Sequence, residues 1–503
     1  MLNNIIKVIL WGDEVGTLYW DAAKGCSVFS FNDRFVSKNL NVSPIVAPIV
    51  NGKVIRKSFL GNKDKIYQGL PEFLADSLPD HWGNLIFEQW AKQNNVSLRD
   101  LTPVDKLCFI GSRAMGAFEF QPETNIGTFD NQIQLDSLYK LARKIFLERE
   151  DVKIESDEPL TLQGLYEVGT SAGGKHPKAI IAIDKNTGDI RSGQVILPEN
   201  YEYYILKFAE SDDFPFTNIE MTYYKMALAA GINIMPSKLI SVEGREHFLT
   251  QRYDRIDGKK VFVQTLAAIS TDASSYESLF EVARYIGVSS AEQAELFRRL
   301  VFNIFAGNVD DHQKNFSFFM DENGSWHITP AYDVTFTTNL NGPVYERVHT
   351  MSVCGKTNDI TKDDLLYFAK SNGIKNAKSI IEDVAKSVST FYKIAIDCGV
   401  SVYWADKIEE YLITIMPAEY TSGMTNYIPS FIEPFVTENG VPVSDVKFHE
   451  TERHDIVIYA TINGISRKHT FYKNSDQAAA ISKYGANHIP EQMQKALIEE
   501  FLK

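Results

Sequence analysis

The chain has 503 residues, 44% of them hydrophobic, with a formal net charge of −14 and a pI near 5.3. This length predicts a soluble globular protein of about two to four structural units. The acidic net charge excludes a protein whose whole surface binds nucleic acid, because phosphate binding requires clustered Lys and Arg. It does not exclude a local basic patch.

Cysteine usage and hydropathy indicate the compartment. The four cysteines lie far apart and form no C-x-x-C pair, so we expect reduced thiols and neither a disulfide framework nor a zinc ribbon. The first residues lack the basic and apolar regions of a signal peptide, and no segment approaches the roughly 18 apolar residues of a membrane span. We therefore expect a cytoplasmic location without membrane insertion.

The first predicted unit, residues 1–110, begins as a small β-rich subdomain. Up to about residue 60, short apolar runs alternate with turn signals, a pattern typical of hairpins. From Leu70 the pattern changes, and Pro71–Gly83 leads into an amphipathic helix predicted at Asn84–Gln93.

The second predicted unit, residues 111–265, contains a loop of small residues. The segment Val168–Lys178 precedes a strand predicted at Ala179–Asp184. Small residues let backbone N–H groups approach phosphate oxygens, and a lysine at the loop's exit adds charge. The candidate phosphate-binding residues are Ser171, Gly173, Gly174 and Lys178. The pattern is neither a Walker A motif nor G-x-G-x-x-G, so an ordinary hairpin loop would also explain it.

A lysine follows within the next predicted strand, Tyr203–Phe208. Lys207 is embedded in a run that is otherwise apolar, and a buried lysine requires an anion. Glu220 lies near the start of the predicted helix Asn218–Ala230, on the face that also carries Tyr223. A strand lysine followed by a helix glutamate is the order of the phosphate-positioning ion pair in kinases, although a structural salt bridge or an edge-strand lysine would look the same.

A third strand is predicted at His247–Tyr253, where the two halves of the protein should meet. Backbone groups near Gln251 and Tyr253 are candidates for hydrogen bonds to adenine, and the Tyr253 ring for apolar contact. A plain amphipathic strand explains these residues equally well.

The third predicted unit, residues 266–415, is helical. Its apolar periodicity predicts helices at Glu292–Ala306, Lys362–Ser371, Ser379–Asp397 and Ala405–Met416. A β-rich half followed by a helical half predicts an α+β, bilobed protein-kinase-like fold. We expect this fold to comprise a small N-terminal β-rich subdomain, an all-helical C-terminal lobe and an extra C-terminal α/β segment.

A polar cluster follows the first of these helices, after Gly307. Asp310 can accept a hydrogen bond from a substrate hydroxyl, Asn315 supplies an amide oxygen for magnesium, and Lys314 can steady phosphate charge. A hairpin predicted from Phe316 to Ile328 would bring Asp333 back beside Asn315 as a second metal ligand. A solvated polar loop would show the same spacing.

The last predicted unit, residues 416–503, holds a hairpin, Asp455–Thr461 and Ile465–Phe471, that turns at Asn463-Gly464. Helices are predicted at Ser475–Lys483 and Pro490–Leu502. A structural cap on the helical lobe, a lid, a docking surface for a partner or a dimer contact would each fit this unit.

Several ordered blocks within residues 1–415 resemble the HipA family of serine/threonine kinase toxins from bacterial toxin–antitoxin modules. The blocks are Gly69–Gly83, Ile110–Ala117, the Ser171 loop, Ile205–Lys207, Gln251–Arg255, Asn308–Asn315 and Pro330–Asp333. The phosphate loop departs from the family pattern by an additional basic residue and a proline, and residues after about 415 lie outside the resemblance.

The resemblance implies a protein kinase that uses ATP and Mg²⁺. By motif position it implies Asp310 as the catalytic aspartate, Asn315 and Asp333 as magnesium ligands, and Lys207 and Lys178 as phosphate contacts. It assigns adenine to the segment from Gln251 to Tyr253, and it implies that autophosphorylation of Ser171 disables the enzyme. A phosphoserine there would place about two negative charges where ATP phosphates must bind.

The resemblance also implies partners. These are a HipB-like helix-turn-helix antitoxin, DNA reached through that antitoxin, and a protein substrate such as glutamyl-tRNA synthetase. Two other functions fit the residues: a non-catalytic nucleotide-binding regulatory partner of a DNA-binding antitoxin, and a small-molecule kinase.

Overall fold

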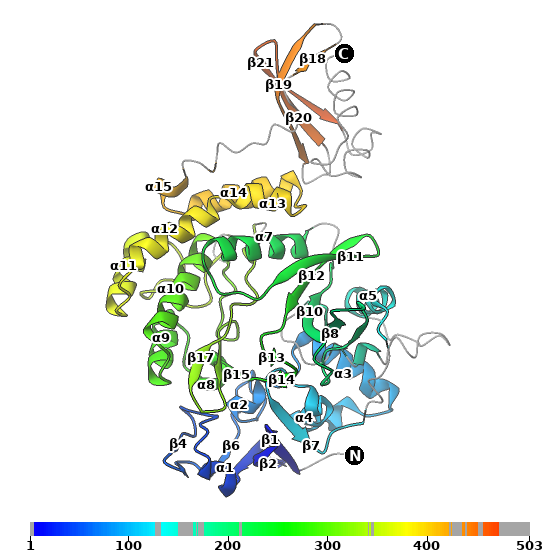
Figure 1. Cartoon of the computed structure of the whole chain (residues 1–503), viewed down its shortest axis with the longest axis vertical. Helices are drawn as coiled ribbons and strands as arrows, with labels where there is room; N and C mark the ends of the chain where they lie inside the picture. Colours follow the sequence, from blue (N-terminus) through cyan, green and yellow to red (C-terminus); the bar gives the residue numbers. More distant parts are fainter. Residues whose placement is uncertain are drawn as a thin grey trace.

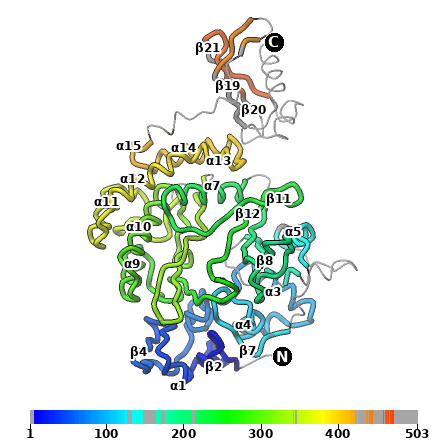
Figure 2. Tube along the Cα trace, viewed as in Figure 1, coloured from blue at the N-terminus to red at the C-terminus, as the bar shows by residue number. Residues whose placement is uncertain are grey.

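A computed structural model gives the fold. It describes residues 5–125, 132–148, 164–166, 168–169, 176–210, 214–340, 342–343, 347–421, 424, 435–437, 440–450 and 456–471. The molecule is elongated, with an N-terminal sheet at one end and a C-terminal sheet at the other (Figure 2). The predicted α+β kinase-like fold is confirmed.

The N-terminal sheet is antiparallel, with the order β6-β3-β2-β1-β7. Its strands are β1 (Ile5–Leu10), β2 (Asp13–Asp21), β3 (Cys26–Phe31), β6 (Ser58–Leu60) and β7 (Phe118–Gln121). Phe29 and Phe31 of β3 pack against Phe73 of the following segment, on the buried face of the sheet. The boundary predicted at residue 110 falls before β7, which pairs with β1.

Short elements complete this end of the molecule. They are α1 (Asp33–Ser37), the hairpin of β4 (Ile49–Val50) and β5 (Lys53–Val54), α2 (Glu72–Ala75), α3 (His81–Gln93), α4 (Pro103–Ile110) and α5 (Leu135–Arg143). Helix α4 begins with a capping box, in which Thr102 and Asp105 each bond the other's backbone N–H. The helix predicted at Asn84–Gln93 is confirmed and starts three residues earlier, at His81.

The second sheet has the order β11-β12-β10-β8-β9 and all its pairs are antiparallel. Its strands are β8 (Lys178–Asp184), β9 (Ile190–Ser192), β10 (Tyr201–Lys207), β11 (Ser237–Val242) and β12 (Arg245–Gln251). Helix α7 (Phe216–Ala229) follows β10 and contacts β11 and β12 (Figure 1). All three strands predicted in this region are confirmed, with ends shifted by up to two residues.

The helical part contains α8 (Leu266–Ile269), α9 (Tyr276–Tyr285), α10 (Ser290–Phe305), α11 (Lys362–Ser371), α12 (Ala377–Val388), α13 (Phe391–Asp397), α14 (Val402–Ile415) and α15 (Ala418–Thr421). It also holds a three-stranded sheet, β15 (Phe262–Thr265), β16 (Ser317–Met320) and β17 (Trp326–Ile328), in that order. The predicted hairpin from Phe316 to Ile328 is therefore confirmed, and the lobe is not wholly helical.

One predicted helix is wrong: Ser379–Asp397 is two helices, α12 and α13. The hydroxyls of Ser389 and Thr390 donate to the carbonyls of Lys386 and Ser387, at 2.8 and 2.6 Å. Such local bonds compete with the helical backbone ladder. Periodicity alone missed the break because the apolar residues continue on both sides of it.

The C-terminal sheet has the order β18-β19-β20-β21, with β18 (Phe435–Val436), β19 (Pro442–Glu450), β20 (Ile456–Ile462) and β21 (Ile465–Phe471). The predicted hairpin is confirmed as β20 and β21, which turn at Asn463 and Gly464 with φ of 50° and 73°. Strand β19 contacts α14. The helices predicted at 475–483 and 490–502 lie outside the described residues.

Two apolar cores hold the larger part together. One runs continuously from the N-terminal sheet into α7, α10, α12 and α14. The other lies between α3, α5 and the second sheet. The four cysteines are free thiols, and no helix within the described residues is long and apolar enough to span a membrane.

Candidate active site

The polar loop begins where the buried helix α10 ends. Gly307, with φ of 63°, turns the chain out of the helix, and β16 begins at Ser317. Between them, the Asn315 side-chain Nδ2 donates to the Asp310 carbonyl at 2.7 Å, while the Asp310 carboxylate is exposed. This hydrogen bond fixes the orientation of the Asn315 side chain. Its Oδ1 atom is then left to bind another partner.

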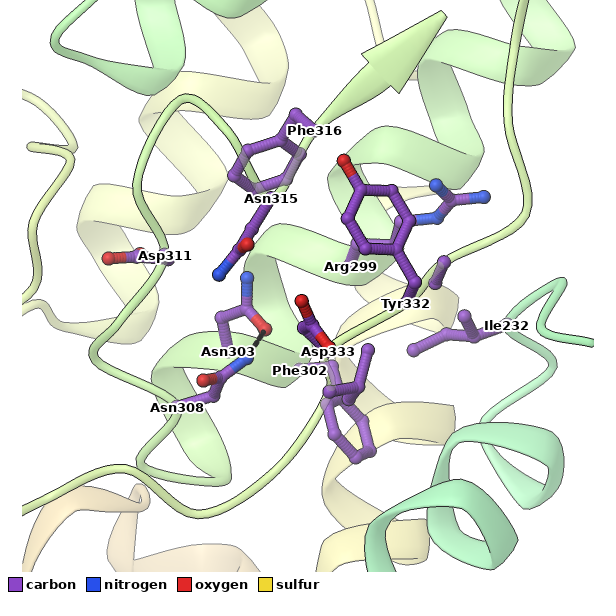
Figure 3. Close-up of a pocket in the computed structure, with 12 residues that line it drawn as sticks. Ile232, Arg299, Phe302, Asn303, Asn308, Asp311, Asn315, Phe316, Tyr332 and Asp333 are labelled. Carbon is purple, nitrogen blue, oxygen red and sulfur yellow. Dashed lines mark hydrogen bonds between the residues drawn. The ribbon is translucent and has the colours of Figure 1, made fainter. Parts of the chain in front are cut away.

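The hairpin returns the chain to this loop, as the spacing predicts. Asn315 and Asp333 line one pocket together with Asn303, Asn308 and Arg299 (Figure 3). Asp333 has φ of 50°, a left-handed conformation that Asp adopts more readily than most residues.

Lys207 connects this pocket to the second sheet. Its Nζ lies 2.6 Å from Glu220 Oε1 of α7 and also forms an ion pair with Asp333 Oδ1. The exposed fractions of the three side chains are 16%, 12% and 35%, so Asp333 is the most accessible member. We call Lys207, Glu220 and Asp333 the cleft cluster.

The charges of the cleft cluster determine its protonation. Burial acts against ionisation of Asp333, but the Lys207 and Lys178 ammonium groups hold its pKa at about 2. Burial also lowers the pKa of Lys207, yet Asp333 and Glu220 raise it above the usual value overall. Burial raises the pKa of Glu220, partly offset by Lys207. Asp333 is thus an ionised carboxylate at neutral pH.

Lys178 lies beside this cluster. It pairs with Lys207 in the register of β8 and β10, and the Trp82 indole of α3 donates to its carbonyl at 2.8 Å. Burial lowers the pKa of Lys178, and the negative charges of Asp333 and Asp80 oppose that shift. The structure therefore brings Lys178 and Lys207 together on adjacent strands, next to Asp333.

The remaining predicted residues do not line this pocket in the part of the chain that the structure describes. Gln251 ends β12 and pairs with Tyr204. The Tyr253 ring stacks on Tyr332 at a centroid distance of 5.6 Å, so one ring face is covered by protein. Lys314 is exposed, and its carbonyl accepts a bond from the Tyr332 hydroxyl at 2.8 Å. Ser171, Gly173 and Gly174 lie outside the described residues.

Three residues near the site escaped sequence reasoning. Arg299 is 7% exposed and lines the pocket, and Asp311 is 1% exposed. Both side-chain oxygens of Asp80 are buried, and burial raises the pKa of this carboxyl to about 6. The sequence predicted helix α3 only from Asn84 onwards, and nothing in it placed Asp80 near Lys178.

Comparison with known proteins identifies the family. The family profile described as HipA N-terminal domain matches residues 6–121, and the profile described as HipA-like C-terminal domain matches residues 170–391. Together they cover most of the chain up to residue 391.

Curated relatives match over shorter stretches. The Haemophilus influenzae protein named Putative kinase is 25% identical over 204 residues, which are 36% of this chain and 57% of that protein. Putative kinase Y4mE of Sinorhizobium fredii is 29% identical over 137 residues, 24% of this chain and 32% of that protein. The chain thus spans 57% and 32% of the length of these two relatives.

A solved structure shares the fold. It is the HipA, HipB and operator DNA complex of the Shewanella oneidensis MR-1 toxin–antitoxin system. The TM-score is 0.55 at 16% identity, covering 84% of this chain and 97% of that one. With both family profiles matched in order and this fold, the chain belongs to the HipA family, whose curated relatives bear kinase names.

Proposed function

We propose that this protein is a serine/threonine protein kinase that transfers the ATP γ-phosphate to a hydroxyl of another protein. The observation that carries the proposal is the cleft cluster next to the Asp310 loop. Lys207 holds Glu220 at 2.6 Å and contacts Asp333, and Asn315 is tied to Asp310 a short distance away. Phosphoryl transfer depends mainly on such positioning and charge stabilisation.

Each side chain has a role in this proposal. Asp310, which is exposed and ionisable, orients the acceptor hydroxyl and takes up its proton. Partial burial and the nearby charges of Asp333 and Asp311 raise the pKa of Asp310, while His312 opposes them. Lys207 and Lys178 contact ATP phosphates, and Glu220 keeps Lys207 in place.

The donor set fits magnesium. Asn315 presents an amide oxygen, and Asp333 is an ionised carboxylate whose Oδ1 faces Lys207, which leaves Oδ2 for a metal. Within the described residues no three His, Cys, Asp or Glu side chains form a metal cluster. Mg²⁺ commonly binds to one or two protein oxygens, and phosphate and water oxygens complete its coordination shell. The ion would then neutralise the negative charge that develops on the phosphate.

The wider ATP site follows from the same reasoning. We assign the Ser171, Gly173 and Gly174 loop and Lys314 to the phosphates, and Gln251 with Tyr253 to adenine. Because Tyr332 covers one face of Tyr253, only the opposite face and the edge of that ring would meet the base. Autophosphorylation of Ser171 would place negative charge at the phosphate site and inhibit the enzyme.

We further propose that the kinase is a cytoplasmic toxin neutralised by a HipB-like helix-turn-helix antitoxin that binds DNA. The support is family membership and the HipA, HipB and operator DNA complex that shares the fold. The substrate would be a translation component such as glutamyl-tRNA synthetase. The proposed units remain 1–110, 111–265, 266–415 and 416–503, with the last as a cap on the helical lobe.

Radiolabel transfer from [γ-³²P]ATP to proteins of a bacterial extract tests the function. We expect Mg²⁺-dependent labelling by the wild type and none by Asp310→Ala or Asp333→Ala. Equal labelling by these variants would refute the site. ATP binding by calorimetry without any turnover would favour the regulatory partner, and label found only in the small-molecule filtrate would favour a small-molecule kinase.

A further inference from the structure

Two adjacent aspartates of the loop face different environments. Asp310 is exposed, whereas Asp311 is 1% exposed and points away from Asn315 and Asp333 (Figure 3). Sequence alone gives no reason to treat them differently, because both are acidic residues at the start of one polar loop.

The Asp311 carboxylate accepts hydrogen bonds from two distant segments. Oδ2 accepts from the Tyr276 hydroxyl of α9 at 2.7 Å and from His349 Nδ1 at 2.9 Å. Oδ1 accepts from the backbone N–H groups of Thr350 at 2.8 Å and Met351 at 3.3 Å. Four donors saturate the carboxylate, which leaves it no lone pair for a substrate hydroxyl.

The bonds continue from Tyr276 to the neighbouring aspartate. Asn303 Nδ2 donates to the Tyr276 hydroxyl at 3.0 Å, and Asn308 Nδ2 donates to Asn303 Oδ1 at 3.0 Å. The Thr337 hydroxyl donates to Asn308 Oδ1 at 3.2 Å. The backbone N–H of Asp310 then donates to that Thr337 hydroxyl at 3.0 Å, so the chain of bonds ends on Asp310 itself.

The segment that carries His349 is also fastened to the loop. The Thr350 backbone N–H and hydroxyl both donate to the Val309 carbonyl, each at 3.1 Å. Hydrogen bonds from this segment thus hold the loop on both sides of Asp310, at Val309 and at Asp311. A buried carboxylate costs free energy when its donors are lost, so these contacts form or break together.

We propose that Asp311 is a positioning residue, which fixes the backbone of the loop so that Asp310 presents its carboxylate to the acceptor hydroxyl. The inference rests on the proposed kinase function. His349 and Tyr276 act through Asp311, and the segment 347–353 becomes a support of the catalytic loop. Misplacement of a catalytic group by about 1 Å costs on the order of 100-fold in rate.

The test is Asp311→Asn, whose amide cannot accept from all four donors and brings its own N–H groups against them. We expect kcat to fall about 10- to 100-fold, while the KM for ATP changes less than about threefold. The exposed Asp363→Asn on α11 is the matched control and should keep wild-type kinetics. Tyr276→Phe removes one donor without changing the ring and should lower kcat by about 3- to 10-fold.

Hydrogen–deuterium exchange supplies a second measurement. Asp311→Asn should exchange faster at 308–315 and 347–353 and as slowly as the wild type in α12. Wild-type kcat in folded Asp311→Asn, or equal losses in kcat and ATP affinity, would overturn the inference. If that variant does not fold, unchanged kcat and exchange in Tyr276→Phe would overturn it.

Exchange also separates the two proposals. If the wild type transfers no phosphate, the kinase function fails. Faster exchange in both segments of Asp311→Asn would then still support anchoring of the loop by Asp311, and unchanged exchange would refute it.

Discussion

Two buried groups of charges in this protein differ in how fully they are satisfied. The cleft cluster leaves Asp333 35% exposed beside the pocket. A second group, Arg252, Asp254 and Arg255, is at most 2% exposed in its side chains, and we call it the arginine cluster. Each group pairs a carboxylate with a cation, yet of the two only the cleft cluster contributes a residue, Asp333, to the pocket.

In the arginine cluster, the guanidinium groups donate their hydrogen bonds to Asp254 and to backbone carbonyls. Arg252 bonds both oxygens of Asp254 at 2.8 and 2.7 Å and the Gly193 carbonyl at 2.7 Å. Arg255 donates to Asp254 and to the Gly116 and Ala114 carbonyls, while the Gly116 N–H donates to Asp254. This cluster fastens the residue 114–116 turn to the end of β12.

The pKa values of the two central carboxylates are shifted in the same direction. Burial acts against ionisation of Asp254, but Arg252 and Arg255 hold its pKa well below the usual value. A similar depression holds for Asp333, so the direction of a pKa shift does not distinguish the two. The two groups differ in their access to the pocket, which Asp333 lines.

The largest expected effect is loss of transfer in Asp333→Ala. Removal of the proposed magnesium ligand should lower phosphoryl transfer by about 1,000-fold or more, because the metal neutralises phosphate charge. Lys207 keeps Glu220 as a partner, so the protein should remain folded. Radiolabel transfer across a Mg²⁺ titration measures this, and activity restored to the wild-type level at high Mg²⁺ would contradict a loss of catalysis.

Asp254→Asn should affect stability instead. Removing one partner of a buried ion pair typically costs about 3–5 kcal/mol of unfolding free energy. Two arginines would then face each other inside the protein without compensation. Urea unfolding measures the loss, and kcat per folded molecule should stay within about twofold. A folded variant with wild-type stability and reduced kcat would reverse the roles of the two clusters.

Lys207→Met should have an effect of intermediate size, on the affinity for ATP. The variant loses the charge proposed to contact the ATP phosphates, so ATP affinity should fall about tenfold, as expected for a charge-assisted hydrogen bond. Isothermal titration with ATP and Mg²⁺ measures it, and Lys356→Met on the surface is the control. Unchanged affinity would remove Lys207 from the ATP site.

Glu409→Gln should have the smallest effect on phosphoryl transfer. Glu409 is a buried carboxyl that has no cation as a partner among the described residues. Burial raises the pKa of Glu409 to about 8 from the usual 4.5. Because the folded pKa lies above the unfolded one, the wild type loses stability as the pH rises from 4.5 towards 8. The variant should be more stable at pH 8, by up to about 4 kcal/mol, and nearly equal at pH 4.5. Thermal unfolding at both values checks the sign.

Much of the fold could be predicted from sequence. Alternating and helical periodicities located the strands and helices near the site to within a few residues, and Asn463-Gly464 located the last turn. The spacing of Asp310, Asn315 and Asp333 predicted that they lie near one another, since a helix end and a short hairpin leave few other arrangements, and their catalytic roles stay a prediction.

Long-range packing could not be predicted. Asp310 and Asp311 differ only because Tyr276 and His349, both more than 30 residues away, bury the second one. Asp80 reaches the neighbourhood of Lys178 through the packing of α3 on β8, which leaves no periodic signal. The arginine cluster was part of a block that suggested nucleotide contacts, and only its saturated hydrogen bonds showed a structural role.

The most direct test of the kinase site is single-turnover transfer of labelled γ-phosphate with saturating ATP and Mg²⁺, comparing the wild type with Asp310→Asn. The amide has nearly the same shape and cannot take up the acceptor proton, so transfer should fall at least about 100-fold while ATP binding is retained. Equal single-turnover rates for the two proteins would contradict the proposed role of Asp310 and of the pocket around it.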